Sequence, residues 1–295
     1  MSIAYFNGEF LPLESVRISP LDRGFLFGDS VYEVIPSYAG HLFLLGEHLD
    51  RLHRSLDAIR IQSPLSVAQW QVMLEELVRR NEGYVPADLG LYLQVTRGVA
   101  PRDHVFPPDG QATIFAMANP IAPLAETIRT VGVAAVTAAD TRWSRCDIKA
   151  TTLLANVLAR QDAREQDAAE AILLRDGQVT EGAASNVFAV VDDTVVTPPL
   201  APSLLPGVTR ALVLRLAAQC GLHVVERRLS ETELRTAREI WLTSSTKEVL
   251  PVCRLDGEPV GDGVPGPAWR TVHAAYQEAK TAARQDCATV GAVHE

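Results

Sequence analysis

Two segments in the first third of the chain repeat apolar residues at the spacing of an amphipathic helix. Residues 46–61 and 66–83 both show this period, and Ser66 stands where a helix N-cap is expected, because its hydroxyl can accept a backbone N–H. The pattern predicts two helices that each bury one face. Their apolar positions are Leu49, Leu52, Leu56 and Ile59 in the first, and Val67, Trp70, Leu74, Leu77 and Val78 in the second.

Strand signals surround these two helices. Asn7-Gly8 stands between two β-prone runs and predicts a hairpin with a type I′ turn, whose central residues both need a positive φ. Residues 30–40, 89–98 and 112–119 are further β-prone runs. Residues 1–118 are therefore expected to form a small N-terminal α+β domain. The two prolines in residues 119–123 predict an interdomain linker, since proline neither continues a helix nor donates to a sheet.

Residues 124–284 are expected to form a larger C-terminal domain of mixed α/β type, followed by a disordered tail at 285–295. Strands are predicted at 128–139, 223–230 and 239–245. A helix with an apolar stripe is predicted from about Thr151. No Gly-x-Gly-x-x-Gly follows a strand, so a Rossmann unit is not expected. The stripe consists of Leu153, Leu154, Val157 and Leu158; further helices are predicted from Val208 to Cys220-Gly221 and from about Pro267, and hairpin turns at Asp176-Gly177, Asp192-Asp193 and Asp256-Gly257.

The composition is that of a globular protein, with 47% hydrophobic and 21% charged residues. A net charge of -9 argues against nucleic acid or an anionic membrane as partner. No apolar run approaches the roughly 20 residues of a membrane helix. Four scattered cysteines without a Cys-x-x-Cys pair predict free thiols and no metal site. The N-terminal segment lacks the features of a signal peptide, so a cytoplasmic location is expected.

Lysine is scarce in this chain, which has only Lys149, Lys247 and Lys280 among its 27 Lys+Arg residues. Lys149 stands at the junction between a polar turn and an apolar helical pattern, where arginine would serve a solvated surface equally well. An amine that is partly withdrawn from water loses its proton more easily, and this suits a Schiff-base nucleophile. A surface lysine in a loop is the alternative interpretation of the same position.

A cofactor of the pyridoxal phosphate type needs, besides a lysine, a carboxylate beside its pyridine nitrogen and a cradle for its phosphate. Glu181 in VTEGAASNVF can supply the carboxylate, although a solvated turn glutamate is the alternative. Gly207 opens a predicted helix, so the N–H groups of Val208 and Thr209 can face an anion. The segment from Thr243 to Thr246 adds hydroxyl donors at a strand end.

The segment VTRGVAPRDHVFPP carries a candidate carboxylate receptor. Arg102 and His104 alternate, and alternating residues of an extended chain point to one side. A guanidinium pairs with a carboxylate through two parallel hydrogen bonds. A mobile polar loop bounded by prolines is the alternative.

Seven separated stretches follow one another in the order of one family's motifs. They are DRGFLFGDSVYEV, EHLDRL, VTRGVAPRDHVFP, RWSRCDIKATTLLANVLA, VTEGAASNVF, PGVTR and TSSTKEVLPV. In these the chain resembles the class IV aminotransferases, the fold-type IV pyridoxal-phosphate enzymes, and among them the D-amino acid aminotransferase group. The resemblance extends from the N-terminal hairpin to about Glu258. It implies a two-domain fold-type IV architecture, pyridoxal 5'-phosphate as cofactor, and a homodimer.

The resemblance also implies a role for each matched residue. Lys149 resembles the lysine that holds the cofactor as a Schiff base and then shuttles the α-proton, and Glu181 the carboxylate that keeps the pyridine nitrogen protonated. The remaining matches fall into two groups. Arg51, Val208, Thr209, Ser244 and Ser245 resemble the phosphate-binding residues, while Tyr32, Arg102 and His104 resemble the carboxylate trap, with Arg102 and His104 reaching in from the partner subunit.

The activity implied is ping-pong transamination of D-amino acids such as D-alanine or D-glutamate with 2-oxo acids such as 2-oxoglutarate or pyruvate. Handedness comes from the resemblance, because residue spacing cannot show it. The same fold leaves three other activities open: a branched-chain L-amino acid aminotransferase, an (R)-amine transaminase and an aminodeoxychorismate-type lyase. A non-catalytic protein that only binds the cofactor or a partner is the alternative of a different class.

Four positions depart from the pattern of the D-alanine enzymes. Ala183 and Ala184 stand where serines are usual, Ser30 replaces a glycine, and Pro206 replaces a lysine before Gly207. These departures are expected to alter hydrogen bonds behind the site and the range of accepted side chains. They leave the lysine, the glutamate and the carboxylate trap intact.

Overall fold

The computed structural model describes residues 2–83 and 88–285, and within them the chain forms two compact units. The first unit contains the chain up to Ala122, the residues from Lys280, and the short segment Ile148–Thr152. The second unit consists of Pro123–Asp147 and Leu153–Ala279. Residues 286–295, where most of the disordered tail was expected, lie outside the described residues.

The first unit is built on an antiparallel sheet with the strand order β2-β1-β6-β5-β3-β4. The turn between β1 and β2 has positive φ at Asn7 (47°) and Gly8 (103°), so the predicted hairpin is confirmed. The strands are β1 (Ile3–Phe6), β2 (Glu9–Pro12), β3 (Ser30–Tyr38), β4 (His41–Leu42), β5 (Asp88–Thr96) and β6 (Thr113–Pro120); a 3-10 turn, η1 (Leu13–Ser15), and a short helix, α1 (Arg23–Phe27), precede β3.

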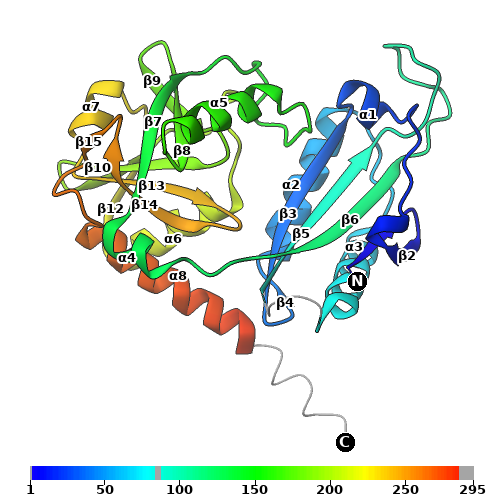
Figure 1. Ribbon diagram of the computed structural model, residues 1–295, viewed down its shortest axis with the longest axis horizontal. Coiled ribbons are helices and arrows are strands. Elements are labelled where there is room, and N and C mark those ends of the chain that lie inside the picture. Colours follow the sequence, from blue (N-terminus) through cyan, green and yellow to red (C-terminus); the bar gives the residue numbers. More distant parts are fainter. Residues whose placement is uncertain (1, 84–87, 286–295) are drawn as a thin grey trace, which may run out of the picture. The chain divides into compact units, whose positions relative to one another are not determined.

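Two helices, α2 (Leu45–Ala58) and α3 (Val67–Asn81), pack against this sheet (Figure 1). Both were predicted from the apolar period, and their apolar stripes form one core with the sheet. Burial of these side chains is the main favourable term in the stability of the unit. Val67 is an exception, because it is 55% exposed at the first position of α3. The fully buried helix positions are Leu49, Leu52, Leu56, Trp70, Leu74 and Leu77.

The predicted N-cap at Ser66 is confirmed as a complete capping box. The hydroxyl of Ser66 accepts the backbone N–H of Gln69 at 3.3 Å, and the side chain of Gln69 accepts the N–H of Ser66 at 2.9 Å. We expect Ser66→Ala to lower the free energy of unfolding by about 1 kcal/mol, because it removes one acceptor from the first turn. Ser66→Asp can accept the same bond and should leave chemical denaturation unchanged; equal losses in both variants would contradict the capping role.

The second unit contains a mixed sheet with the strand order β12-β11-β10-β13-β14-β7-β8-β9, and β15 pairs with β14. Three neighbouring pairs are parallel, namely β11 with β12, β14 with β7, and β7 with β8. The other pairs are antiparallel. The strands are β7 (Val133–Ala139), β8 (Glu170–Arg175), β9 (Gln178–Gly182), β10 (Asn186–Val191), β11 (Thr194–Thr197), β12 (His223–Glu226), β13 (Glu239–Ser244), β14 (Glu248–Leu255) and β15 (Glu258–Pro259).

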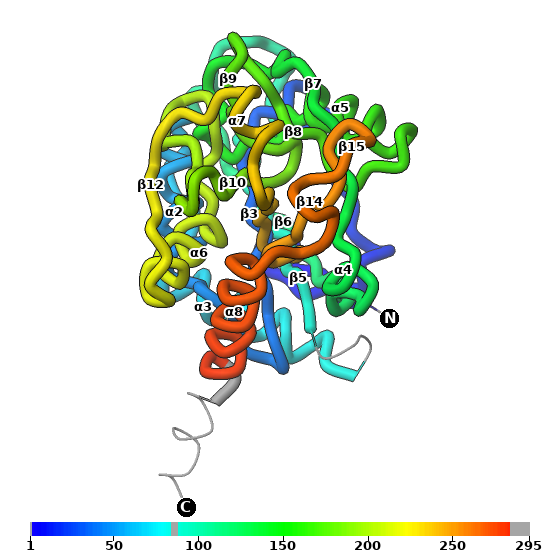
Figure 2. The backbone as a smooth tube through the Cα atoms, turned by 90° about the vertical axis from the view of Figure 1, so that its left-hand side faces the viewer, coloured from blue at the N-terminus to red at the C-terminus, as the bar shows by residue number. Residues whose placement is uncertain are grey.

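Four of the described helices of this unit lie against the same sheet, and α6 (Val208–Gln219) lies beside β12 (Figure 2) and also contacts β13. Three predicted hairpins are confirmed, since their turns have positive φ at Asp176, Asp192, Asp193 and Asp256. The predicted end of α6 is also confirmed, with Gly221 at φ 78°. The helices are α4 (Glu126–Val131), α5 (Leu154–Glu165), α6 (Val208–Gln219), α7 (Glu231–Thr236) and α8 (Pro267–Gln285), of which the residues from Lys280 belong to the first unit.

Three local predictions were wrong. Residues 128–131 form the end of α4 rather than a strand, and Gly132 ends this helix at φ 76°, so the strand begins only at Val133. The helix expected from about Thr151 begins at Leu154; Thr151 belongs to the segment beside β3 and donates its N–H to the Ser30 carbonyl. The linker expected at 119–123 begins later, because Asn119 and Pro120 still belong to β6 and pair with β5. Pro120 is tolerated there because β1 pairs with β6 only up to Met117, so Pro120 has one neighbouring strand.

The apolar stripe of α5 is exposed rather than buried. Leu154 is 72% exposed, Val157 58% and Leu158 56%, so this face of the helix has no apolar cover within the described chain. Periodicity identified the stripe but could not tell what covers it.

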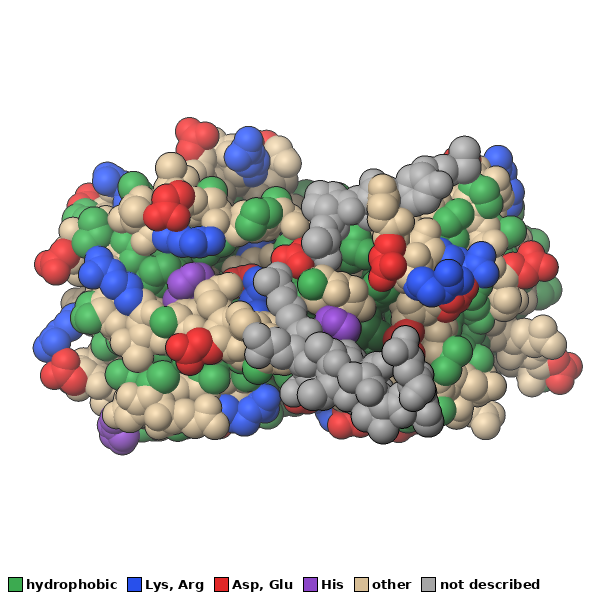
Figure 3. Space-filling view, turned by 90° about the horizontal axis from the view of Figure 1, so that it is seen from below, with side chains coloured by type: hydrophobic (Ala, Val, Ile, Leu, Met, Phe, Trp, Pro, Cys, Tyr) green, Lys and Arg blue, Asp and Glu red, His purple; other side chains and the backbone are tan. Residues whose placement is uncertain are grey.

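Charged side chains are interspersed over the surface. On the face in Figure 3, basic and acidic groups alternate and form no single basic patch. None of the described helices has the length and apolar character that spanning a membrane requires.

Candidate active site

Lys149 is held in the first unit by its backbone. Its carbonyl accepts the N–H of Tyr32 at 2.9 Å, and its own N–H donates to the Ser55 hydroxyl at 3.2 Å. The next residue, Ala150, bridges to Val31 of β3. The segment Ile148–Thr152 therefore lies along β3, which fixes where the Lys149 side chain begins.

The amine of Lys149 lies over an aromatic ring. Its Nζ is 4.2 Å from the centroid of the Tyr32 ring, and the side chain is half-buried. Tyr32 stacks in turn on Tyr92 at 5.7 Å, and burial raises the pKa of the Tyr92 phenol to about 12. Among the described residues no ion pair neutralises Lys149, so the amine is available for chemistry.

Arg51, expected at the phosphate, lies on α2 in a buried ionic cluster, one turn before Ser55, whose hydroxyl accepts the Lys149 N–H. Its guanidinium donates through Nε and Nη2 to the two carboxylate oxygens of Glu33, both at 2.7 Å. The Nδ1 of His48 lies 2.8 Å from the same carboxylate. Burial raises the pKa of Glu33, but the charge and hydrogen bonds of Arg51 outweigh it and keep that pKa well below its ordinary value. Burial lowers the pKa of His48 and so favours its neutral form.

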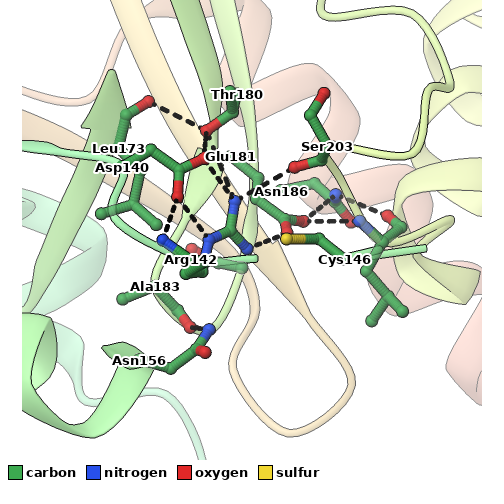
Figure 4. A network of polar contacts seen from close by, with 12 residues as sticks. Asp140, Arg142, Cys146, Asn156, Leu173, Thr180, Glu181, Ala183, Asn186 and Ser203 are labelled. Atoms are coloured by element: carbon green, nitrogen blue, oxygen red, sulfur yellow. Dashed lines mark hydrogen bonds and ion pairs between the residues drawn. The ribbon is translucent and has the colours of Figure 1, made fainter. Parts of the chain in front are cut away.

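Glu181 lies at the end of β9 in the second unit, where three donors hold its carboxylate (Figure 4). Arg142 pairs with one oxygen; the other accepts the side-chain amide of Asn186 at 3.1 Å and the N–H of Leu205 at 3.0 Å. Burial nevertheless raises the pKa of Glu181 to about 7. A buried carboxyl with such a pKa is matched to sharing a proton near neutral pH, and perturbed groups of this kind gather at functional sites.

Asp140 competes with Glu181 for the same guanidinium. Arg142 donates to it through Nε at 2.9 Å and Nη2 at 3.0 Å, and the Thr180 hydroxyl donates at 2.9 Å (Figure 4). Arg175 lies 3.1 Å from the same carboxylate. Burial raises the pKa of Asp140, but the bonds from Arg142 outweigh it and hold the pKa below its ordinary value. Burial is the main cause of the raised pKa of Glu181, and the negative charge of Asp140 raises it further.

The N-terminus of α6 has the properties of an anion site. Val208 and Thr209 begin the helix after Gly207, and no side chain caps its first N–H groups. A side chain at Gly207 would clash with the side-chain oxygen of Asn186, a residue whose amide nitrogen donates to Glu181. Glycine therefore lets the helix start close to Asn186. Unpaired N–H groups and the helix dipole favour a bound phosphate.

The end of β13 offers hydroxyl groups. Ser244 and Ser245 are half-buried, and the Thr243 hydroxyl is buried without a hydrogen-bond partner among the described residues. A buried hydroxyl without a partner is costly, and a ligand oxygen would satisfy it. These residues therefore fit an anionic cofactor.

Arg102 and His104 are both exposed and lie against one aromatic ring. The Arg102 guanidinium is 5.3 Å from the centroid of the Phe27 ring, and the His104 ring is 5.4 Å from it. The two side chains therefore share one surface, as their alternation in the sequence indicated.

Each unit supplies one group of the expected site residues. Lys149, Tyr32, Arg51, Arg102 and His104 belong to the first unit, and Glu181, Val208, Thr209, Ser244 and Ser245 to the second. No group of His, Cys, Asp and Glu able to bind a metal occurs in the described part of the chain. Sequence reasoning missed the residues that hold the site residues in place. The missed residues are Glu33, His48, Asp140, Arg142 and Asn186.

The departures from the family pattern have local partners. The Ser30 hydroxyl bonds to that of Thr151 and accepts the Gln94 amide at 3.2 Å. The Ala183 carbonyl accepts the Asn156 side chain at 2.7 Å. Ser30 thus ties β3 to the segment that carries Lys149. No contact explains the alanine at position 184.

Comparison with known proteins places the chain among relatives of one kind. A family model described as amino-transferase class IV matches residues 30–255. A D-alanine aminotransferase of Bacillus licheniformis is 44% identical over 92% of this chain and 95% of the relative, and one of Staphylococcus haemolyticus is 37% identical over 94% and 98%.

Solved structures are similar over nearly their whole length. A branched-chain amino acid aminotransferase of Escherichia coli has a TM-score of 0.86 and 28% identity, covering 94% of this chain and 93% of that one. A second branched-chain amino acid aminotransferase, from T.th. and with pyridoxamine 5'-phosphate, has a TM-score of 0.86 and 27% identity, covering 95% and 94%. The fold of the chain is therefore the one that these enzymes share.

Proposed function

Because the chain belongs to the class IV aminotransferases, we propose that it is a pyridoxal 5'-phosphate-dependent transaminase of D-amino acids. It moves the amino group of a D-alanine- or D-glutamate-type donor to a 2-oxo acid such as 2-oxoglutarate or pyruvate. The observation that best supports pyridoxal-phosphate chemistry is the half-buried Lys149 amine, which lies over Tyr32 without a carboxylate partner. The D configuration rests on the D-alanine aminotransferases that match almost the whole chain.

We propose that the second unit holds the cofactor phosphate. The N–H groups of Val208 and Thr209 and the hydroxyls of Ser244 and Ser245 would bind it, with Arg51 adding positive charge. The uncapped start of α6 and the partnerless Thr243 hydroxyl support this assignment. Arg51 would act while held by Glu33, which fixes the direction of its guanidinium.

Lys149 would hold the cofactor through a Schiff base. When bound, pyridoxal phosphate supplies an electron sink for the pair left at the substrate Cα. Once the substrate amine has taken the place of Lys149, the free lysine amine would take the proton from the substrate Cα. It would then return this proton to the cofactor carbon that is bonded to the substrate nitrogen. Glu181 would accept the pyridine N–H and keep that nitrogen protonated, with Arg142, Asn186 and Leu205 fixing its orientation.

Glu181→Gln tests this last role. The amide cannot carry the negative charge that holds the pyridine proton, so we expect kcat to fall by about 10²- to 10³-fold. Cofactor binding should change much less, because the phosphate contacts are retained. Steady-state kinetics with a titration of cofactor absorbance measures both; an unchanged kcat would contradict the role of Glu181.

Tyr32, Arg102 and His104 would bind the substrate carboxylate, with Arg102 and His104 serving the site of a partner subunit. We propose a homodimer for this reason, and we also propose a cytoplasmic location, as the N-terminal sequence led us to expect. Exposed apolar side chains support a partner surface: Phe25, Val99 and Val105 around this loop, and the stripe on α5.

Mixing a variant that lacks Lys149 with one that lacks Arg102 tests the shared site. In a hybrid dimer of Lys149→Ala and Arg102→Ala chains, one of the two sites has both residues intact if Arg102 crosses to the partner. Activity should return to about one quarter of the wild-type value after random re-association. If Arg102 acted within its own chain, no hybrid site would be complete and mixing would add no activity.

Half-reactions with single enantiomers test the substrate class. The holoenzyme should be converted to its pyridoxamine form by D-alanine and not by L-alanine, L-leucine or a simple chiral amine. Conversion by L-leucine alone would favour a branched-chain enzyme, as many similar solved structures are named. Pyruvate release without any 2-oxo acid would favour a lyase, and conversion by the amine an (R)-amine transaminase.

A further inference from the structure

The loop that carries Arg102 and His104 is held from beneath by one buried arginine. Arg23, only 3% exposed, donates Nη1 to the carbonyls of Asp103 and Val105 and Nη2 to the carbonyl of His104. Three consecutive carbonyls therefore converge on one guanidinium. Carbonyls of an exposed loop ordinarily bond to water, so this convergence fixes the backbone around His104.

Arg23 is itself fixed by a carboxylate that bridges two arginines. Its Nε donates to Asp29 at 2.8 Å, and Arg97 donates to the same carboxylate through Nε at 2.8 Å and Nη2 at 3.0 Å. Arg97 continues to the carbonyls of Ile59 at 2.6 Å and Arg60 at 3.1 Å. The network thus ties the loop to the residue before β3 and to the end of α2.

Aromatic contacts complete the support. Arg97 lies 3.6 Å from the centroid of the Phe106 ring, beyond His104 in the loop. Phe27 contacts Arg23 at 4.9 Å as well as Arg102 and His104. A guanidinium packs favourably on the face of an aromatic ring. One ring therefore joins the buried arginine to both side chains of the proposed carboxylate trap.

The start of the loop is equally constrained. Gly98 has φ 92°, and a side chain there would clash with the carbonyl of Gln111. Its own carbonyl accepts the N–H of Arg23 at 2.9 Å. Both the backbone and the side chain of Arg23 thus contact the loop, at its beginning and at its tip.

We propose that Arg23 is a positioning residue for the substrate carboxylate, acting through the loop backbone and Phe27 to hold Arg102 and His104 in their binding orientation; this rests on the proposed function of those two residues. Without Arg23 the loop must be ordered each time substrate binds, and that cost falls on substrate binding. The chemistry at Lys149 and Glu181 is unaffected, because neither contacts the network.

Arg23→Lys is the sharpest change. It keeps the positive charge and most of the apolar stem, but a single ammonium cannot reach both Asp29 and three carbonyls as the guanidinium fork does. We expect kcat/KM for D-alanine to fall on the order of 10-fold, through a rise in KM rather than a loss of kcat. Arg79→Lys, which changes an exposed arginine paired with Glu76, is the matched control and should leave kcat/KM unchanged.

A double-mutant cycle with Arg102→Ala separates positioning from a general structural role. If Arg23 acts through Arg102, Arg23→Lys should lower kcat/KM of the holoenzyme less than twofold once Arg102 is absent, against about 10-fold in the wild type. An equal loss in both backgrounds, or a wild-type loss in kcat with KM unchanged, would overturn the proposal.

The same cycle keeps two failures apart. If Arg102→Ala alone leaves KM for D-alanine unchanged, the carboxylate trap itself is refuted. If Arg102→Ala raises KM but Arg23→Lys does not, only the positioning role of Arg23 is refuted. Should Arg23→Lys fail to fold, Phe27→Leu removes the shared ring, and its loss should likewise disappear in the Arg102→Ala background. A loss from Phe27→Leu that is the same in both backgrounds would overturn the proposal.

Discussion

Lys149→Ala should lower the transamination rate by at least about 10³-fold. The amine is proposed both to bind the cofactor and to transfer the α-proton, and a positioned general base alone contributes about 10²- to 10⁴-fold. Lys149→Arg should lose as much, although it retains the positive charge, because a guanidinium does not lose its proton. Single-turnover conversion of D-alanine to pyruvate measures both variants.

Lys247→Ala is the matched control for Lys149. Lys247 is one of the chain's three lysines and its side chain is exposed, so its removal should leave the rate within about twofold. Activity that survives in Lys149→Arg, or that is lost equally in Lys247→Ala, would contradict the special role of Lys149.

Arg142→Met should lower the free energy of unfolding by about 3–5 kcal/mol. The methionine fills much of the volume but leaves the side chains of Asp140, which is fully buried, and Glu181, which is 6% exposed, without their shared cation. Removing one partner from a buried ionic cluster leaves uncompensated charge, and that is among the most costly single changes. Urea denaturation of the cofactor-free protein measures the loss.

The loss from Arg142→Met should depend on pH. Because Arg142 holds the pKa of Asp140 below its unfolded value of 3.8, the stability that this pair contributes is fully present above that value and is lost as pH falls through the folded pKa. The part of the destabilisation that comes from Asp140 should therefore be full at neutral pH and should shrink as the pH falls below 3.8. Arg175→Met removes a half-buried donor to Asp140 and should cost only about 1 kcal/mol; equal costs for the two variants would contradict this account.

Local patterns were sufficient for most of the secondary structure. The capping box at Ser66, the hairpin turns at Asp-Gly and Asn-Gly, and the glycine after α6 have short-range causes, so they could be predicted. The helix α4 could not, because Ile128 to Val131 is a β-prone run and its helical form depends on the turn at Gly132. The stripe on α5 was identified, but its exposure depends on packing.

In the candidate site, too, some residues could be identified from the sequence and others could not. Lys149 and Glu181 could be singled out because their types and neighbours indicate chemistry, and the resemblance then supplied roles for the others. Asp140, Arg142 and Asn186 could not be connected to Glu181, since their hydrogen bonds join segments far apart in the sequence. Glu33 and His48 read as ordinary positions of a strand and a helix face, and only folding reveals that they hold Arg51.

Borohydride reduction followed by peptide mapping tests the central claim most directly. The reagent converts the Schiff base of the holoenzyme to a stable secondary amine, so the cofactor remains attached to the residue that held it. We expect a pyridoxyl label on the peptide that contains Lys149, and no label in Lys149→Ala. A label on Lys247 or Lys280, or reduction of the holoenzyme without any labelled peptide, would contradict it.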